Sequence, residues 1–262
     1  MSFIPPTPRI PPLRLSKIAS TPGYSTRVME LVERIHSVFD LPGVLAMLRS
    51  TTCTIGAEAG AYAVAIPEDE SVRTLKILLA GDPLWGYAQW RACPIEEHPW
   101  FVYATEHHSP QVASRIPVIT DAQHAAIAVA REHGFASALV VPTHCGGGLR
   151  RFGILCLGSS VDGDFEAQGT HVVHMLARSL AMELHEWFAH ETRDSLLRAT
   201  RLRALDLKLL TMQRYGLGSK AIAKRIGMSA TSVDSRFRRI NTRLACPSRK
   251  IAARRAAEYG LI

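Results

Sequence analysis

The sequence predicts an α+β fold: an α/β/α sandwich with an antiparallel sheet, followed by an all-helical domain of four helices. Three observations support this prediction. Strand-like segments between residues 59 and 158 form two close pairs flanked by helical patterns, and strands joined by short turns pair antiparallel. From about residue 201 onward, the apolar residues follow helical spacing only. The charge balance also changes sign near that point.

The positive charge of the chain is concentrated at its C-terminal end. Residues 197–262 carry 16 Lys and Arg against three Asp and Glu, whereas residues 1–196 carry 15 against 20. A mildly acidic body with a strongly basic tail predicts a polyanionic partner for the tail, and nucleic acid fits best. A merely solvated basic face would carry interspersed acids.

The compartment is predicted from cysteines, prolines and apolar runs. The five cysteines show no paired spacing, which is typical of reduced thiols rather than of a disulfide framework. Prolines stand where a signal peptide needs an apolar core. No apolar run approaches the roughly 18 residues that cross a bilayer. We therefore expect a soluble, cytoplasmic protein without a membrane partner.

The first part of the chain is predicted as a proline-rich arm followed by alternating helices and strands. Residues 1–23 are expected to be extended, with no folded element. Leu41-Pro42-Gly43 is expected to end the first helix, and Asp121 to cap a later one. Helices are expected over residues 28–39, 44–48, 84–92, 99–105, 122–132 and about 165–197. Strands are expected over residues 59–66, 72–79, 138–142 and 152–158, with Val118-Ile119 as an extension.

The basic tail is predicted as four helices, over residues 202–214, 219–225, 230–244 and 249–259. Gly216 and Gly227 are natural breaks, and Ser219 and Ser229 can cap the second and third helices. Two helices joined by a tight glycine-containing turn, the second one basic, form a helix-turn-helix. The buried stripe of the third helix is expected to comprise Val233, Phe237, Ile240 and Leu244.

The third helix of the tail is the candidate DNA-reading element. Small polar residues at its start can bond to phosphates, and arginines one to two turns later can reach guanine edges in the major groove. The predicted DNA-binding residues are Lys220, Ser229, Thr231, Ser232, Ser235, Arg236, Arg238, Arg239 and Arg249.

At this point the residues resemble a known family. Residues 209–262 resemble the LuxR-type helix-turn-helix, with Gly218-Ser-Lys-Ala-Ile-Ala, Ser229-Ala-Thr-Ser-Val and Ala256-Ala-Glu-Tyr-Gly-Leu-Ile as its motifs. The family usually opens with an acidic R-E-x-E element, where this chain has Leu205-Asp206-Leu207-Lys208. A single acid, Asp206, remains there, so the internal ion pairing usual in the family is not assured.

The resemblance implies a transcriptional regulator with a front domain that senses a signal. A phosphorylated receiver is excluded because the first 50 residues lack its acidic pair. The length and the strand order resemble the autoinducer-binding domain of quorum-sensing regulators. The implied organisation is an arm (1–23), a sensor and dimerisation domain (24–190), a linker (191–203) and a DNA-binding domain (204–262). The implied partners are double-stranded DNA with a palindromic operator, a second copy of the chain, and a small-molecule signal.

The ligand motif of that domain is matched in part. The family places Tyr four residues after a Trp and Asp-Pro nine residues later, and here the register gives Trp85, Gln89 and His98-Pro99. A neutral His accepts a ligand N–H more weakly than a carboxylate does. The ligand is therefore either an acyl-homoserine lactone or another small molecule, or the domain dimerises without one. The candidate ligand-binding residues are Trp85, Gln89, His98, Tyr62, Trp100 and Cys156.

No cofactor, metal or catalytic residue is predicted. His107-His108 and the pair His171 and His174 lack a nearby Cys or carboxylate to complete a metal set. Cys145 follows His144 in a glycine-rich loop, but no orienting third group is visible in the sequence. An enzyme fused to a DNA-binding tail is thus the less favoured alternative. Another alternative is a ligand-independent regulator or an inhibitory dimerisation partner of another regulator.

Overall fold

The computed structural model describes residues 14–67, 73–145 and 151–262. These residues form two compact units. The first comprises the described residues up to Tyr62, with Ile77–Pro142 and Ile154–Glu183, and the second comprises Ala63–Lys76, Thr143–Gly153 and Leu184–Ile262. The second unit thus combines the C-terminal helices with the ends of several strands.

A five-stranded sheet in the order β2-β1-β5-β4-β3 forms the centre of the fold. Three of the predicted strands extend one or two residues beyond the predicted bounds, and the strand predicted over residues 72–79 lies one residue later. Val118-Ile119 is not a strand, and a short strand at residues 111–112 pairs antiparallel with β4 instead. The two central strands, β4 and β5, are buried over nearly their whole length, as expected for strands covered on both faces. The strands are β1 (Ala59–Pro67), β2 (Arg73–Ala80), β3 (Gln111–Val112), β4 (Ser137–His144) and β5 (Phe152–Ser159).

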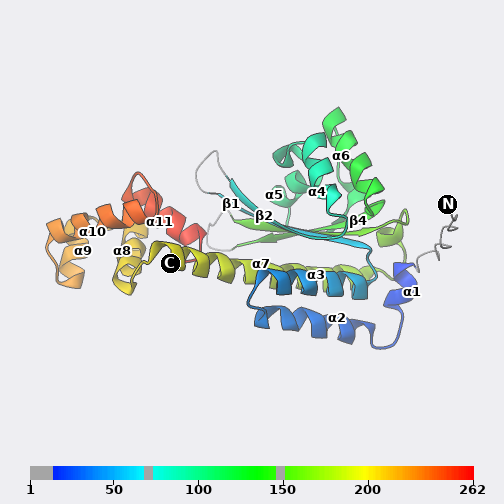
Figure 1. Cartoon of the computed structure of the whole chain (residues 1–262), viewed down its shortest axis with the longest axis horizontal. Helices are drawn as coiled ribbons and strands as arrows, with labels where there is room; N and C mark the ends of the chain where they lie inside the picture. Colours follow the sequence, from blue (N-terminus) through cyan, green and yellow to red (C-terminus); the bar gives the residue numbers. More distant parts are fainter. Residues whose placement is uncertain (1–13, 68–72, 146–150) are drawn as a thin grey trace, which may run out of the picture. The chain divides into compact units, whose positions relative to one another are not determined.

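Helices cover both faces of the sheet, as the predicted sandwich requires (Figure 1). One face carries α2 (Tyr24–Glu33), α3 (Leu41–Ile55) and the first half of α7 (His171–Thr200). The other carries α4 (Leu84–Ala92), α5 (Pro99–Glu106) and α6 (Asp121–Glu132), with α4 packed against α6. Short 3-10 turns η1 (Arg34–Ser37), η2 (Ile95–Glu97), η3 (Ala113–Arg115) and η4 (Asp164–Glu166) join these elements.

Several helix boundaries differ from the predicted ones for local reasons. Part of the arm predicted to be extended is the helix α1 (Leu15–Ala19), because Leu15 is fully buried and its N–H donates to Asp164. Residues 41–43 begin α3 rather than end a helix, since Asp40 caps it and proline is tolerated in a first helical turn. Thr120, not Asp121, caps α6 through a capping box with Gln123.

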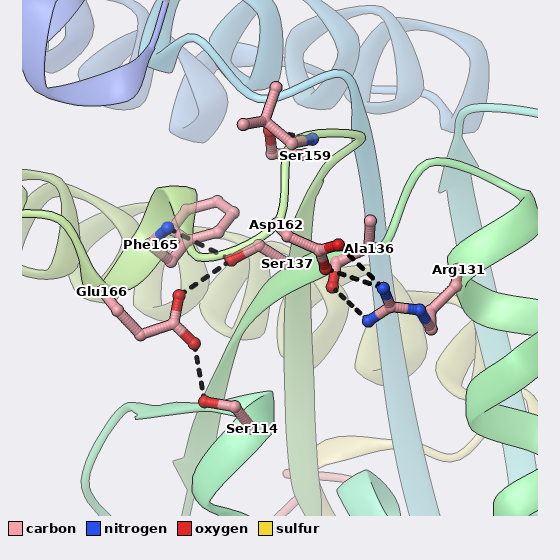
Figure 2. A network of polar contacts seen from close by, with 9 residues as sticks. Ser114, Arg131, Ala136, Ser137, Ser159, Asp162, Phe165 and Glu166 are labelled. Atoms are coloured by element: carbon pink, nitrogen blue, oxygen red, sulfur yellow. Dashed lines mark hydrogen bonds and ion pairs between the residues drawn. The ribbon is translucent and has the colours of Figure 1, made fainter.

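A polar network fixes the connection between α6 and β4 (Figure 2). Arg131 donates to both carboxylate oxygens of Asp162, at 2.8 and 2.9 Å, and to the carbonyl of Ala136 at 3.2 Å. The Ser137 hydroxyl donates to Glu166 and accepts the N–H of Phe165. The network holds the segment that contains Phe135, which contributes to the ligand site described below.

Helix α7 begins six residues later than predicted, because residues 164–166 form the turn η4. It continues without a break to Thr200, so helix occupies most of the predicted linker 191–203. The C-terminal helices are α8 (Ala204–Arg214), α9 (Ser219–Ile226), α10 (Ala230–Arg243) and α11 (Arg249–Glu258), close to the predicted bounds. The predicted stripe of α10 is buried at all four positions. In the described part of the chain, no helix is both long and apolar enough to span a membrane.

Candidate nucleic-acid interface and ligand site

The turn between α9 and α10 is built by one glycine and one cap. Gly227 ends α9 with φ of 69°, a left-handed conformation that side chains rarely adopt. Ser229 then caps α10 as predicted, its hydroxyl accepting the N–H of Ser232 at 3.1 Å. The predicted cap of α9 is different, because Gly218 holds the N-cap position and the Ser219 hydroxyl donates to Asp234 instead.

One face of α10 is polar, basic and exposed. Within the described residues, no acid pairs with Arg238 or Arg239, although three acids lie in the last 66 residues. Lys220, in the first turn of α9, is also exposed. These cations can therefore meet an anionic partner without first breaking an ion pair. The exposed predicted DNA-binding residues of α10 and its cap are Ser229, Thr231, Ser232, Ser235, Arg238 and Arg239.

Arg236 points inward and holds α10 against α8. Its Nε donates to Asp206 Oδ1 at 2.7 Å, and Arg243 lies 3.6 Å from the other carboxylate oxygen. Asp206 also accepts the N–H of Arg203, which begins α8. Burial opposes ionisation of Asp206, but the Arg203 N–H and the Arg236 guanidinium outweigh it and hold its pKa below the usual value. The single acid left in this segment thus makes the internal ion pair that the sequence did not assure.

Arg249 is likewise used inside the helical domain. Its Nη1 donates to the Ser219 hydroxyl at 2.7 Å and lies 3.7 Å from Asp234. The guanidinium also sits 5.9 Å from the ring centre of Phe237. Two of the predicted DNA-binding arginines, Arg236 and Arg249, therefore link helices, whereas Arg238 and Arg239 remain exposed.

A hollow with four arginines opens beside these links. It encloses about 500 Å³, including space open to solvent, and combines the inner ion pair with the exposed side of α10. Its lining residues are Arg203, Asp206, Arg236, Arg239, Ile240 and Arg243. With one carboxylate against four guanidinium groups, the hollow is suited to a phosphate or another anion.

The candidate ligand site is an aromatic cluster in the first unit. The ring of Phe135 stacks on Trp85 with centroids 4.6 Å apart and lies 5.8 Å from the ring of Trp100. Trp85 and Trp100 are buried, whereas Tyr87 and Trp90 on the same helix as Trp85 are 61% and 75% exposed. The aromatic-rich segment thus contains a buried pair, Trp85 and Trp100, and an exposed pair, Tyr87 and Trp90. Their spacing in the sequence did not distinguish the two pairs.

Gln89 and His98 meet as a buried pair beside Trp100. The Gln89 amide lies 3.0 Å from His98 Nε2, and His98 Nδ1 accepts the N–H of Trp100 at the start of α5. Burial lowers the pKa of His98 to about 4, so the ring is neutral near pH 7. A neutral imidazole accepts at one nitrogen only. The Gln89 atom beside Nε2 is its amide nitrogen, and the Gln89 carbonyl oxygen Oε1 has no hydrogen-bond partner among the described residues.

Three buried polar groups of this cluster have no hydrogen-bond partner among the described residues. They are the indole N–H of Trp85, the indole N–H of Trp100 and the carbonyl oxygen Oε1 of Gln89. Buried polar groups are nearly always paired, so each such group calls for an explanation. The two open indole donors are suited to acceptor oxygens of a bound molecule, and the open Gln89 oxygen is suited to one of its donor groups.

The remaining two candidate ligand residues lie on opposite faces of the sheet. A Cβ on Gly158 would meet Phe135, so alternate residues of β5, Cys156 included, face the aromatic cluster. Burial raises the pKa of the Cys156 thiol. A Cβ on Gly60 would meet Thr52 of α3, so Tyr62 faces α3 and not the cluster. The structure therefore brings Trp85, Gln89, His98, Trp100 and Cys156 together, but not Tyr62.

Phe135 was not singled out from the sequence, and no metal was assigned to His107-His108 or to the pair His171 and His174. Phe135 follows a helix end and has no motif around it, so its place between two tryptophans emerges only from the fold. Across the described residues, no group of His, Cys, Asp and Glu is arranged to hold a metal ion.

Comparison with known proteins shows the fold. No protein-family model matches the sequence, and no curated protein matches it in sequence. Escherichia coli SdiA aligns with a TM-score of 0.65 at 15% identity, over 90% of this chain and 98% of SdiA. SdiA in complex with octanoyl-rac-glycerol aligns with a TM-score of 0.61 at 13% identity, over 92% and 98%.

A third structure carries the family name that the sequence motifs suggested. CepR2 from Burkholderia cenocepacia, an N-acylhomoserine lactone-dependent LuxR family transcription factor, aligns with a TM-score of 0.51 at 12% identity. The alignment covers 63% of this chain and 95% of CepR2. The chain therefore has the fold of this class of regulators, which confirms the predicted fold.

Proposed function

We propose that this protein is a LuxR-type transcriptional regulator that binds double-stranded DNA through α9 and α10. The observation that carries the proposal is the exposed face of α10, where Arg238 and Arg239 have no acidic partner in the described part of the chain. The helix is capped at Ser229 and held from behind by Arg236 and Arg249. A rigid helix with free arginines is suited to the major groove.

The proposed regulator acts as a homodimer on an imperfect palindrome. Helix-turn-helix dimers read half-sites about one helical turn apart, so a twofold symmetric protein needs a twofold symmetric operator. Lys220, exposed at the start of α9, is proposed to contact phosphate, whereas Arg238, exposed two turns into α10, is proposed to reach a base edge. The two residues thus have separable effects.

The DNA-binding proposal is tested by fluorescence anisotropy on duplexes that the wild-type protein selects from a random library. We expect Arg238→Ala to lose its preference for selected over random duplexes, a change of about 1–3 kcal/mol. We expect Lys220→Ala to weaken both alike and to reduce the salt slope by about 0.9. Arg131→Ala, which removes a surface arginine of the first unit, is the control. If Arg238→Ala bound both duplexes like the wild type, α10 would not be the reading helix.

The first unit is proposed to bind a neutral small molecule with several acceptor oxygens. The indole N–H groups of Trp85 and Trp100 are open donors, and the Gln89 carbonyl oxygen Oε1 is an open acceptor, whereas the Gln89 amide nitrogen lies against His98. Acyl-homoserine lactones and acyl glycerols both carry carbonyl oxygens on an apolar chain. The open Gln89 oxygen can accept either the amide N–H of a lactone or a hydroxyl of a glycerol, so both classes of ligand fit the open polar groups.

Thermal unfolding of the full chain tests this ligand. Octanoyl glycerol and lactones of varied chain length are the probes, and a ligand at about 100 times its Kd adds roughly 2.7 kcal/mol of stability. For a chain of this size the midpoint rises by about 5–11 °C if it unfolds as one unit. Trp85→Phe keeps an aromatic ring but removes the indole N–H, so the ligand should no longer raise its midpoint. Trp90→Phe, at an exposed residue, should keep the ligand-induced rise. An unchanged shift in Trp85→Phe would remove the indole donor from the site.

A further inference from the structure

Cys145 lies in a polar cluster that has no part in the proposed DNA or ligand sites. Its Sγ is 3.0 Å from Nε2 of His185, on α7, and accepts a hydrogen bond of 3.0 Å from Nε of Arg151. Nδ1 of His185 lies 3.1 Å from the hydroxyl of Thr143. All four residues belong to the second unit. The sequence predicted no partner for Cys145, because His185 is forty positions away and only the fold brings it near.

The surroundings of Cys145 are those of a reactive thiol. The thiolate is the nucleophilic form of cysteine, and a neighbouring guanidinium stabilises it. Arg151 is 7% exposed and His185 is 2% exposed, so both donors are held by packing. Cys145 itself is half-buried, which leaves the sulfur within reach of a small reagent.

His185 can act as a hydrogen-bond donor to the Cys145 sulfur. Burial, followed by the charges of Arg151 and His144, lowers its pKa to about 4. The ring is therefore neutral near pH 7 and can place its single proton on Nε2, toward Cys145, while Nδ1 accepts from the Thr143 hydroxyl. A neutral ring with this pKa is a weak base, which favours a single modification of the thiol over repeated turnover.

We propose that Cys145 is an oxidative modification site, which peroxides convert to a sulfenic acid. The thiolate sulfur attacks one oxygen of hydrogen peroxide, the S–O bond forms as the O–O bond breaks, and hydroxide leaves and is neutralised to water by the proton that the thiol released on ionisation. Sulfur is oxidised by two electrons and the peroxide is reduced by the same two. The proposal does not depend on DNA binding.

The modification reaches the C-terminal helices through Arg151. Nη1 of Arg151 donates to the carbonyl of Glu258, the last residue of α11, at 3.5 Å. An oxygen added to Sγ must occupy space next to the two atoms that now lie 3.0 Å from it. The added oxygen needs the space that the Arg151 side chain fills, and Arg151 is only 7% exposed. The guanidinium is therefore displaced, its hydrogen bond to the Glu258 carbonyl is lost, and the end of α11 is loosened.

The first test compares cysteines within the full-length protein. The reduced protein is treated with hydrogen peroxide, sulfenic acids are trapped with a cyclic 1,3-diketone, and the peptides are quantified by mass spectrometry over time. We expect Cys145 to react about tenfold faster than Cys53, because Arg151 donates a charged hydrogen bond to its sulfur. Cys53 is the more exposed of the two, so simple accessibility predicts the opposite order. Equal or faster labelling of Cys53 would overturn the proposal.

Two further measurements separate reactivity from structure. Arg151→Gln should slow the labelling of Cys145 about tenfold, whereas Arg34→Gln, at an exposed residue of the first unit, should leave it unchanged. Hydrogen exchange over residues 249–258 should become faster after oxidation of the wild type and should not respond to peroxide in Cys145→Ser. If Cys145 were labelled and hydrogen exchange over residues 249–258 stayed the same, the link to α11 would be refuted. Both measurements can be made even if the protein binds no DNA duplex.

Discussion

Removal of the Asp206 side chain tests how the helical domain is held together. In Asp206→Ala, α8 loses the carboxylate that accepts the Arg203 N–H at 2.9 Å, and Arg236 loses its partner at 2.7 Å. The lost cap costs about 1 kcal/mol. The charged hydrogen bond costs roughly 1.5–3 kcal/mol because the carboxylate is only 4% exposed. The contact with Arg243, which is 42% exposed, adds little.

The free energy of unfolding of the helical domain should therefore fall by about 3 kcal/mol. Urea unfolding followed by circular dichroism measures it, and a double-mutant cycle with Arg236→Ala isolates the ion pair, with an expected coupling of roughly 1.5–2 kcal/mol. Because the folded-state pKa of Asp206 is lowered, this stabilisation is present above about pH 4 and is lost as the pH falls through that lowered pKa. A coupling below about 0.5 kcal/mol would refute a stabilising role of the pair.

Three further predictions concern stability. Gly158→Ala should destabilise the first unit by about 1–3 kcal/mol, because the new Cβ would lie 2.4 Å from Phe135. Gly86→Ala is the control, because no atom lies near its Cβ position. Thermal unfolding compares the two variants, and equal midpoints would contradict the packing described. His98 titrates near pH 6.5 when unfolded and about 4 when folded, so stability should fall by about 3 kcal/mol as the pH drops between these values, and a decline of the same size in His98→Asn would contradict this. Ser229→Ala should cost about 1 kcal/mol in urea unfolding, and an unchanged midpoint would show that the cap contributes nothing.

The arginines of the tail divide into two groups that their spacing does not distinguish. Arg236, Arg238 and Arg239 stand within four positions of each other, and all three were predicted to bind DNA. The structure pairs Arg236 with an acid thirty residues earlier in the chain and leaves the other two exposed. Since a neutralised arginine must break its pair before it meets a phosphate, the exposed residues are the better candidates for DNA contact.

The sequence by itself determined the features that depend on neighbours along the chain. The period of apolar residues predicted the buried stripe of α10, because helical periodicity places every third or fourth side chain on one face. Gly227 and Ser229 marked the turn, since a left-handed residue and a capping hydroxyl are local requirements. The paired strands and the basic tail were predicted for the same reason.

Only the tertiary structure decided the features that depend on residues far apart in the chain. It turned Tyr62 toward α3, inserted Phe135 between Trp85 and Trp100, and placed His185 against Cys145. Hydrogen bonds, ring contacts and ion pairs act over a few ångströms. Partners on different elements reach that distance only after the sheet and its helices have packed, so no local pattern encodes them.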